Sequence, residues 1–176
     1  MRRRALLAGL AATLAAGPAG PAAAHTLVRQ WEVYRAKHLV IGCDRGDPLA
    51  YRTAKAVERA LAEDLPAASA RVARAPHPER LASLMATAQL DLALLAPATA
   101  QAMAAGSGVF APYGPQALST LFLMPTGHAL LAHPRFPDRH ATVVARALGT
   151  GPLADPASLA TAPPCPWRPE ALAALR

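Results

Sequence analysis

The chain has 176 residues, of which 53% are hydrophobic and 16% are charged, with a formal net charge of +7. This composition is typical of a folded chain, and the length suits a single domain with a substantial core. The arginines are scattered rather than clustered with aromatic residues, which make up only 5% of the chain. A nucleic-acid partner is therefore not supported.

The first 24 residues have the pattern of an export signal. Residues 2–4 are arginines, residues 5–16 form an apolar run, and residues 22–24 are alanines of a small-residue cleavage site. The arginines also resemble a twin-arginine signal, so the export route stays open. We expect a periplasmic protein whose mature chain begins at His25, with its net charge lowered from +7 to +4 by loss of three arginines. The alternatives are an uncleaved anchor or a disordered tail.

Three strand patterns, each followed by a helical pattern, come next. The strands are expected near residues 39–42, 70–74 and 91–95, and the helical segments that follow cover residues 49–61, 79–88 and 97–103. Strands that alternate with helices in units of this length predict a parallel sheet with right-handed crossovers. We therefore predict an α/β fold, a three-layer lobe with a mostly parallel sheet, over residues 25–148.

The pattern changes after Met103. Residues 106–108 contain two glycines and form a break, and residues 118–132 read as a hairpin of two strands. A helix is predicted from residue 137 to residue 148. Residues 149–176 are rich in Pro and Ala and are expected to be a C-terminal tail with a short last helical turn.

The loops after the predicted parallel strands should line one edge of the sheet, where ligands bind in such folds. The candidate ligand-binding residues in these loops and in the helix starts that follow them are Asp44, Arg45, Asp47, Tyr51, His77 and Thr99. Arg45 is the natural partner for a carboxylate or phosphate, reinforced by helix N-termini directed at the same edge. The alternative is that Arg45 simply pairs with Asp44 or Asp47 at the surface.

Cys43 and Cys165 are the only two cysteines of the chain. In the oxidising compartment that an export signal implies, a disulfide between them would pin the tail across the loop edge. The alternative is two independent thiols, one of them buried beside the sheet, because spacing alone does not fix disulfide geometry.

Histidines offer a different chemistry. A mature N-terminal His25 would present an α-amino group and an imidazole together, and His128, His133 or His140 could supply a second imidazole for copper. This is the alternative function, an exported copper-handling or enzyme-accessory protein. The other interpretation is that these are ordinary surface histidines, and the spacings typical of zinc sites are missing from the sequence.

Sequence motifs for catalysis are also missing. The chain contains no G-x-S-x-G elbow, no phosphate-binding G-x-x-x-x-G-K-[ST] loop and no G-x-G-x-x-G after a strand. We therefore predict a protein that is not an enzyme and that needs no cofactor.

The order of elements resembles a known family. Residues 39–42, followed by a helix that contains Tyr51, resemble the opening of periplasmic solute-binding proteins with the type II fold, and are most similar to the TAXI-type receptors of TRAP transporters. Residues 79–84 followed by residues 90–95 look like the helix and "D-L-A" strand of that family. Residues 128–148 resemble the segment in which such receptors return to their first lobe.

The resemblance implies transport, with a small anionic solute or a periplasmic protein as partner and a membrane permease beside it. Two departures stand out. The first loop, residues 43–47, is charged where the family has glycines, and only residues 106–116 stand where the family inserts a second lobe. The chain therefore resembles one lobe of a two-lobed receptor, which should bind a small molecule poorly unless a partner covers the site.

Overall fold

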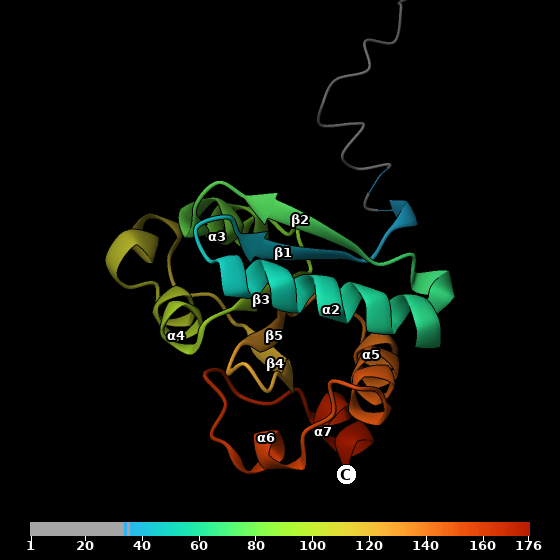
Figure 1. Cartoon of the computed structure of the whole chain (residues 1–176). Coiled ribbons are helices and arrows are strands. Elements are labelled where there is room, and N and C mark those ends of the chain that lie inside the picture. Colours follow the sequence, from blue (N-terminus) through green and yellow to red (C-terminus); the bar gives the residue numbers. More distant parts are fainter. Residues whose placement is uncertain (1–33, 35) are drawn as a thin grey trace, which may run out of the picture.

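The computed structural model describes Tyr34 and residues 36–176, which form a five-stranded sheet in the order β2-β1-β3-β5-β4 (Figure 1). β1 (Val40–Asp44) pairs in parallel with both β2 (Arg71–Ala75) and β3 (Leu92–Leu95). The prediction of three parallel strands in one sheet is confirmed.

The predicted hairpin is also present, and it extends the same sheet. β5 (Ala129–Ala132) runs antiparallel to β3 on one side and to β4 (Ser119–Leu123) on the other. The sheet is therefore mixed, with β4 and β2 at its two outer edges.

Most helices begin at a proline. The helices are α2 (Pro48–Asp64), α3 (Pro78–Ala86), α4 (Pro97–Ala105), α5 (Asp138–Thr150), α6 (Pro156–Ala160) and α7 (Pro169–Leu175), with 3-10 turns η1 (Pro66–Ala68) and η2 (Gly108–Tyr113). Proline fits the first helical position because the N–H it lacks would have no partner inside the helix. Five of the six α-helices in the described part of the chain therefore begin at a proline that stabilises the helix start.

Helices cover both faces of the sheet. Alternate residues of β1 and β3, such as Ile41 and Leu94, pack in a core with α2, α5 and α7. The residues between them, such as Val40 and Leu95, pack in a second core with α3, α4 and η2. The result is the three-layer arrangement predicted from the sequence, with α2 on one face of β1 and α3 on the other (Figure 1).

Residues predicted as a tail are packed against the outer strand β4. The backbone N–H of Thr120 donates to the carbonyl of Pro166 at 2.8 Å, and the N–H of Arg168 donates to the carbonyl of Thr120 at 2.9 Å. This short pairing covers an edge strand that would otherwise expose unpaired backbone groups. The predicted boundary between the lobe and the C-terminal tail, after residue 148, falls inside α5. The tail packs on β4, whereas the prediction placed it across the loops that follow the parallel strands.

Arg168 fastens this segment to the start of α5. Its guanidinium group donates to the carbonyl of Phe136 at 2.6 Å and to the carbonyl of His133 at 3.4 Å, and it also binds the Asp138 carboxylate. The Arg168 side chain is only 11% exposed. Residues far apart in the sequence are thereby joined at one point.

The predicted disulfide between Cys43 and Cys165 is wrong. Both cysteines are free and buried. Cys43 packs with α2 and α5, whereas Cys165 packs with α3 and α4, so the sheet lies between the two sulfur atoms. Burial raises the pKa of the Cys43 thiol to about 11, against a smaller lowering by Arg74, and burial also raises the pKa of Cys165.

Among the described residues, none of the helices combines the length and the hydrophobicity needed to cross a membrane. The predicted export signal at residues 1–24 and His25 lie outside the described residues.

Gly42 in β1 provides a test of how α3 packs on the sheet. A Cβ at this position would meet Leu90 Cδ2 at 2.3 Å and Leu81 Cδ2 at 2.8 Å. We predict that Gly42→Ala lowers the free energy of unfolding by about 1–3 kcal/mol, because two buried leucines must move. Urea denaturation measures the change.

Gly46→Ala is the matched control for this substitution. Gly46 is exposed, and a Cβ there would come no closer than 3.3 Å to the Asp44 side chain. Its substitution should change stability by less than about 0.5 kcal/mol. Equal stability of Gly42→Ala and the unaltered protein would contradict the close packing of Leu81 of α3 and of Leu90, in the loop before β3, on β1.

Candidate functional site

The carboxyl ends of β1, β2 and β3 lie together, because the three strands are parallel. We call this end of the sheet the carboxyl edge. The chain leaves β1 through α2 on one face and leaves β3 through α4 on the other face, so the connections diverge between β1 and β3. Ligands of open α/β sheets bind at such a switch point.

The turn between β4 and β5 also reaches the carboxyl edge. Because β5 is antiparallel to β3, its first residue, Ala129, pairs with Leu95 at the end of β3. His128 and Thr126, which precede β5, are thereby placed beside the loop that follows β1. This juxtaposition was not predicted from the sequence.

Asp47 joins α2 to that turn. Its Oδ1 accepts hydrogen bonds from the N–H groups of Leu49 at 3.0 Å and Ala50 at 2.9 Å, which caps α2. Its Oδ2 lies 3.0 Å from Nε2 of His128, whose side chain is only 6% exposed. Burial raises the pKa of Asp47, but the hydrogen bonds from His128 and from the two N–H groups outweigh burial and hold this pKa below its usual value.

The contact continues from His128 to two hydroxyl groups. A carboxylate can only accept, so Nε2 of His128 carries the proton, and Nδ1 of a neutral ring can accept from the Thr126 hydroxyl at 3.3 Å. The Thr126 hydroxyl is also 3.3 Å from that of Thr53 in α2. Asp47, His128, Thr126 and Thr53 therefore form one polar network between α2 and the β4–β5 turn.

A carboxylate, an imidazole and a hydroxyl in this order can orient a base. Acyl-transfer chemistry would also need backbone donors at the reacting oxygen. The N–H of Gly127, next to Thr126, donates instead to the carbonyl of Met124 at 2.8 Å. The contacts of the network connect α2 to the β4–β5 turn and so position the two loops relative to each other.

Arg45 lies in the loop after β1 with its side chain exposed. Its backbone N–H donates to the carbonyl of Ala75 at 2.8 Å, which fixes the loop against the end of β2. Asp44 accepts from the N–H of Gly46 at 2.9 Å, and Asp47 is engaged as described above. Within the described part of the chain the Arg45 guanidinium forms no ion pair, so the simple pairing with Asp44 or Asp47 is not what the structure has.

Tyr51 contacts a second arginine that the sequence analysis did not single out. The guanidinium carbon of Arg74, near the end of β2, lies 4.5 Å from the centre of the Tyr51 ring in α2. A cation over an aromatic face is attracted by the ring electrons. This contact holds a second positive group beside the loop that contains Arg45.

His77 and Thr99 occupy the starts of α3 and α4 at the same edge. His77 precedes α3, and its Nδ1 lies 3.0 Å from the Glu79 carboxylate, so it is engaged with α3 rather than with the first loop. Thr99 lies in the first turn of α4. Neither helix has a side-chain cap on its first turn.

The alternative copper site requires His25 together with one further histidine, and this pairing stays a prediction. His128 precedes β5 and His133 follows it, so an extended strand separates them by about 16 Å. These two histidines therefore cannot bind the same ion, and His25, the first ligand of the predicted site, lies outside the described residues. In the part of the chain that the structure describes, no group of three His, Cys, Asp or Glu side chains is placed to hold a metal.

No family model matches the chain, and no curated protein or solved structure matches it either. The function is therefore argued from the geometry and chemistry of the site.

Asp47→Ala tests the network at the carboxyl edge. Loss of the helix cap should lower the free energy of unfolding by about 1–2 kcal/mol at neutral pH. Because the folded-state pKa of Asp47 lies below 3.8, the contribution of the ionised carboxylate is fully present above that pH and is lost as the pH falls through the folded-state pKa. The difference between variant and unaltered protein should therefore shrink in acid.

Denaturant titrations at several pH values measure this difference. Glu63→Ala, at an exposed position of the same helix, is the control and should have little effect at any pH. An Asp47→Ala difference that is absent at neutral pH, or that stays constant into acid, would contradict the assigned role.

Proposed function

We propose that the chain is an exported binding protein, a single-lobe relative of periplasmic solute receptors, that takes an anionic group at the carboxyl edge. That group belongs to a small solute or to a periplasmic protein partner. The observation that carries the proposal is the state of Arg45. Its guanidinium group is exposed and has no ion-pair partner in the described part of the chain, while the neighbouring carboxylates of Asp44 and Asp47 are engaged by their own loop.

Other positive groups support the same edge. Arg74 is held against Tyr51, one residue before Ala75, whose carbonyl binds the N–H of Arg45. The starts of α3 and α4 add backbone N–H groups and the positive ends of two helices. A carboxylate or phosphate suits this combination, because guanidinium groups bind both through paired hydrogen bonds.

The absence of a second lobe shapes what can be bound. Between α4 and β4 the chain contains only η2 and short connections, so nothing in the described residues closes over the carboxyl edge as an opposing lobe would. Leu49, in the first turn of α2, is 46% exposed at this edge. A solute here would keep one side in water, so tight binding needs a partner surface.

The proposed export rests on the sequence of the first 24 residues. The arginines, apolar run and alanines of residues 1–24 support export to the periplasm. A periplasmic protein or a membrane permease would supply the missing surface. The proposal contains no catalytic step, because the Asp47–His128 network serves to position the loops.

Anion titration tests this proposal. We expect succinate or inorganic phosphate to bind the purified protein and raise its unfolding temperature. Arg45→Gln should weaken that binding by about tenfold, because it removes a charge-assisted hydrogen bond. Isothermal titration calorimetry measures both affinities.

Arg59→Gln is the matched control. Arg59 is exposed in the second half of α2, away from the carboxyl edge, so its substitution should leave the affinity unchanged. The proposal is wrong for small solutes if neither anion binds, or if Arg45→Gln and Arg59→Gln behave alike.

A further inference from the structure

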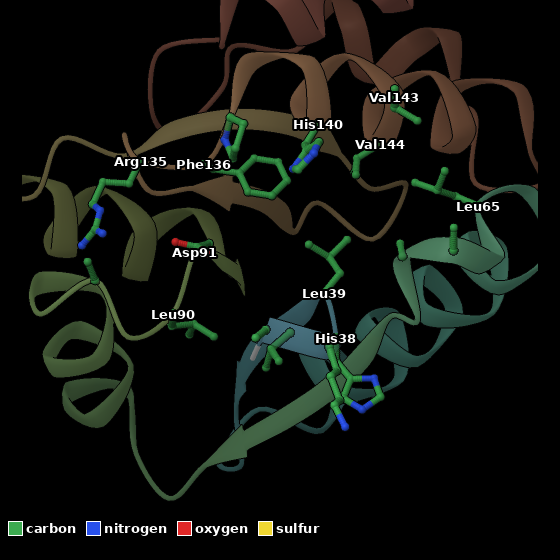
Figure 2. A pocket seen from close by; sticks show the side chains of 17 residues that line it. His38, Leu39, Leu65, Leu90, Asp91, Arg135, Phe136, His140, Val143 and Val144 are labelled. Carbon is green, nitrogen blue, oxygen red and sulfur yellow. The ribbon is translucent and has the colours of Figure 1, made fainter. Parts of the chain in front are cut away.

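A cavity of about 730 Å³ lies at the opposite end of the sheet, where β1 and β3 begin. We call this end the amino edge. One wall comes from the residues around the start of β1 and from the loop before β3, and the other comes from the start of α5 (Figure 2). The sequence-predicted site residues lie at the carboxyl edge, so the strands, about 16 Å long, separate the two places.

The walls of this cavity are largely apolar. Figure 2 shows the Phe136 ring on one wall facing Leu39 and Leu90 on the other. Val143 and Val144 of α5 extend the wall that contains Phe136. A concave, mostly apolar space of a few hundred Å³ with a small number of polar groups is the usual form of a small-molecule site.

The charged groups around the cavity are predominantly positive. Lys37 and Arg135 are both exposed at its rim, and Asp91 is the single carboxylate among the described residues that line it. Asp91 acts electrostatically on His133, whose pKa is lowered first by burial, against the raising effect of Asp91. Arg135 forms no ion pair within the described part of the chain.

Hydrogen bonds of the backbone fix the position of Arg135 at the rim of the cavity. Its N–H donates to Nδ1 of His133 at 3.1 Å, and Phe136 follows directly with its N–H bonded to the carbonyl of His133 at 2.9 Å. The carbonyl of Phe136 is held in turn by Arg168. A cation and an aromatic ring are thereby presented side by side at the mouth of an apolar space.

We propose that this cavity binds a small amphipathic carboxylate. Its apolar body lies between Phe136 and the leucines of the opposite wall, and its carboxylate meets Arg135 at the rim. An amine would be attracted by the one carboxylate among the described lining residues, Asp91, but repelled by two cations, Lys37 and Arg135, and a neutral molecule would leave the guanidinium group without a partner. This site is independent of the anion site proposed at the carboxyl edge.

Three probes with one apolar body and different head groups test the proposal. We expect 4-phenylbutanoate to bind the purified chain about tenfold more tightly than 4-phenylbutan-1-ol, with 4-phenylbutylamine weakest, in isothermal titration calorimetry. Arg135→Gln should bring the affinity for the carboxylate down to that for the alcohol, and leave the alcohol unaffected. Arg146→Gln, an exposed arginine of α5 outside the cavity lining, is the control and should change neither affinity.

A second variant tests the proposal by filling the cavity with a larger side chain. Val143 lines the cavity but is 42% exposed, so Val143→Trp can occupy the space without disturbing the core. Binding of both the carboxylate and the alcohol should be lost while the unfolding midpoint is retained. The proposal is overturned if the unaltered protein does not bind 4-phenylbutanoate, if Val143→Trp binds it as before, or if the amine binds as tightly as the carboxylate. Arg45→Gln should leave this binding intact, which separates it from the carboxyl-edge site.

Discussion

Burial of the central sheet on both faces is the constraint on which the rest of the structure depends. Every residue of β3 and of β5 is buried, and each is apolar. Each methylene group removed from water contributes about 0.8 kcal/mol, so helices must cover both faces of these strands. Polar side chains and ligands can then be placed only at the two ends of the sheet. Both proposed sites lie at those ends, because the faces have no room for them.

The loops at each end are held by one charged side chain that joins distant segments. At the carboxyl edge Asp47 caps α2 and binds His128, a residue 81 positions later. At the other end Arg168 binds the carbonyls of His133 and Phe136. Hydrogen bonds to charged groups are worth about 1.5–3 kcal/mol, twice the usual value, so each contact fixes its loops. Rigid loops lower the entropy that a ligand must overcome on binding.

The sequence was sufficient for the parts of the fold that depend on local pattern. Strands β1, β2 and β3 and the helices between them follow from the alternation of short strand-like runs with helical segments. The place of the hairpin was not predicted, although a signal was present: residues 129–132 are entirely apolar, which is typical of an interior strand. Without that placement the contact of Asp47 with His128 could not be foreseen. The disulfide prediction failed for the same reason, because it required knowing on which face of the sheet the tail packs.

The two proposed sites differ in the part of a ligand that they can recognise. Arg45 and Arg74 stand at an open edge among polar loops, so only the charge of an anion is recognised there. Arg135 stands at the mouth of an apolar cavity, so charge and an apolar body are recognised together. Burial of the apolar body contributes about 25 cal/mol per Å², a contribution that the open edge lacks. Tight binding without any partner protein is therefore better supported at the amino edge, whereas tight binding at the carboxyl edge needs an opposing surface to exclude water from the arginine contacts.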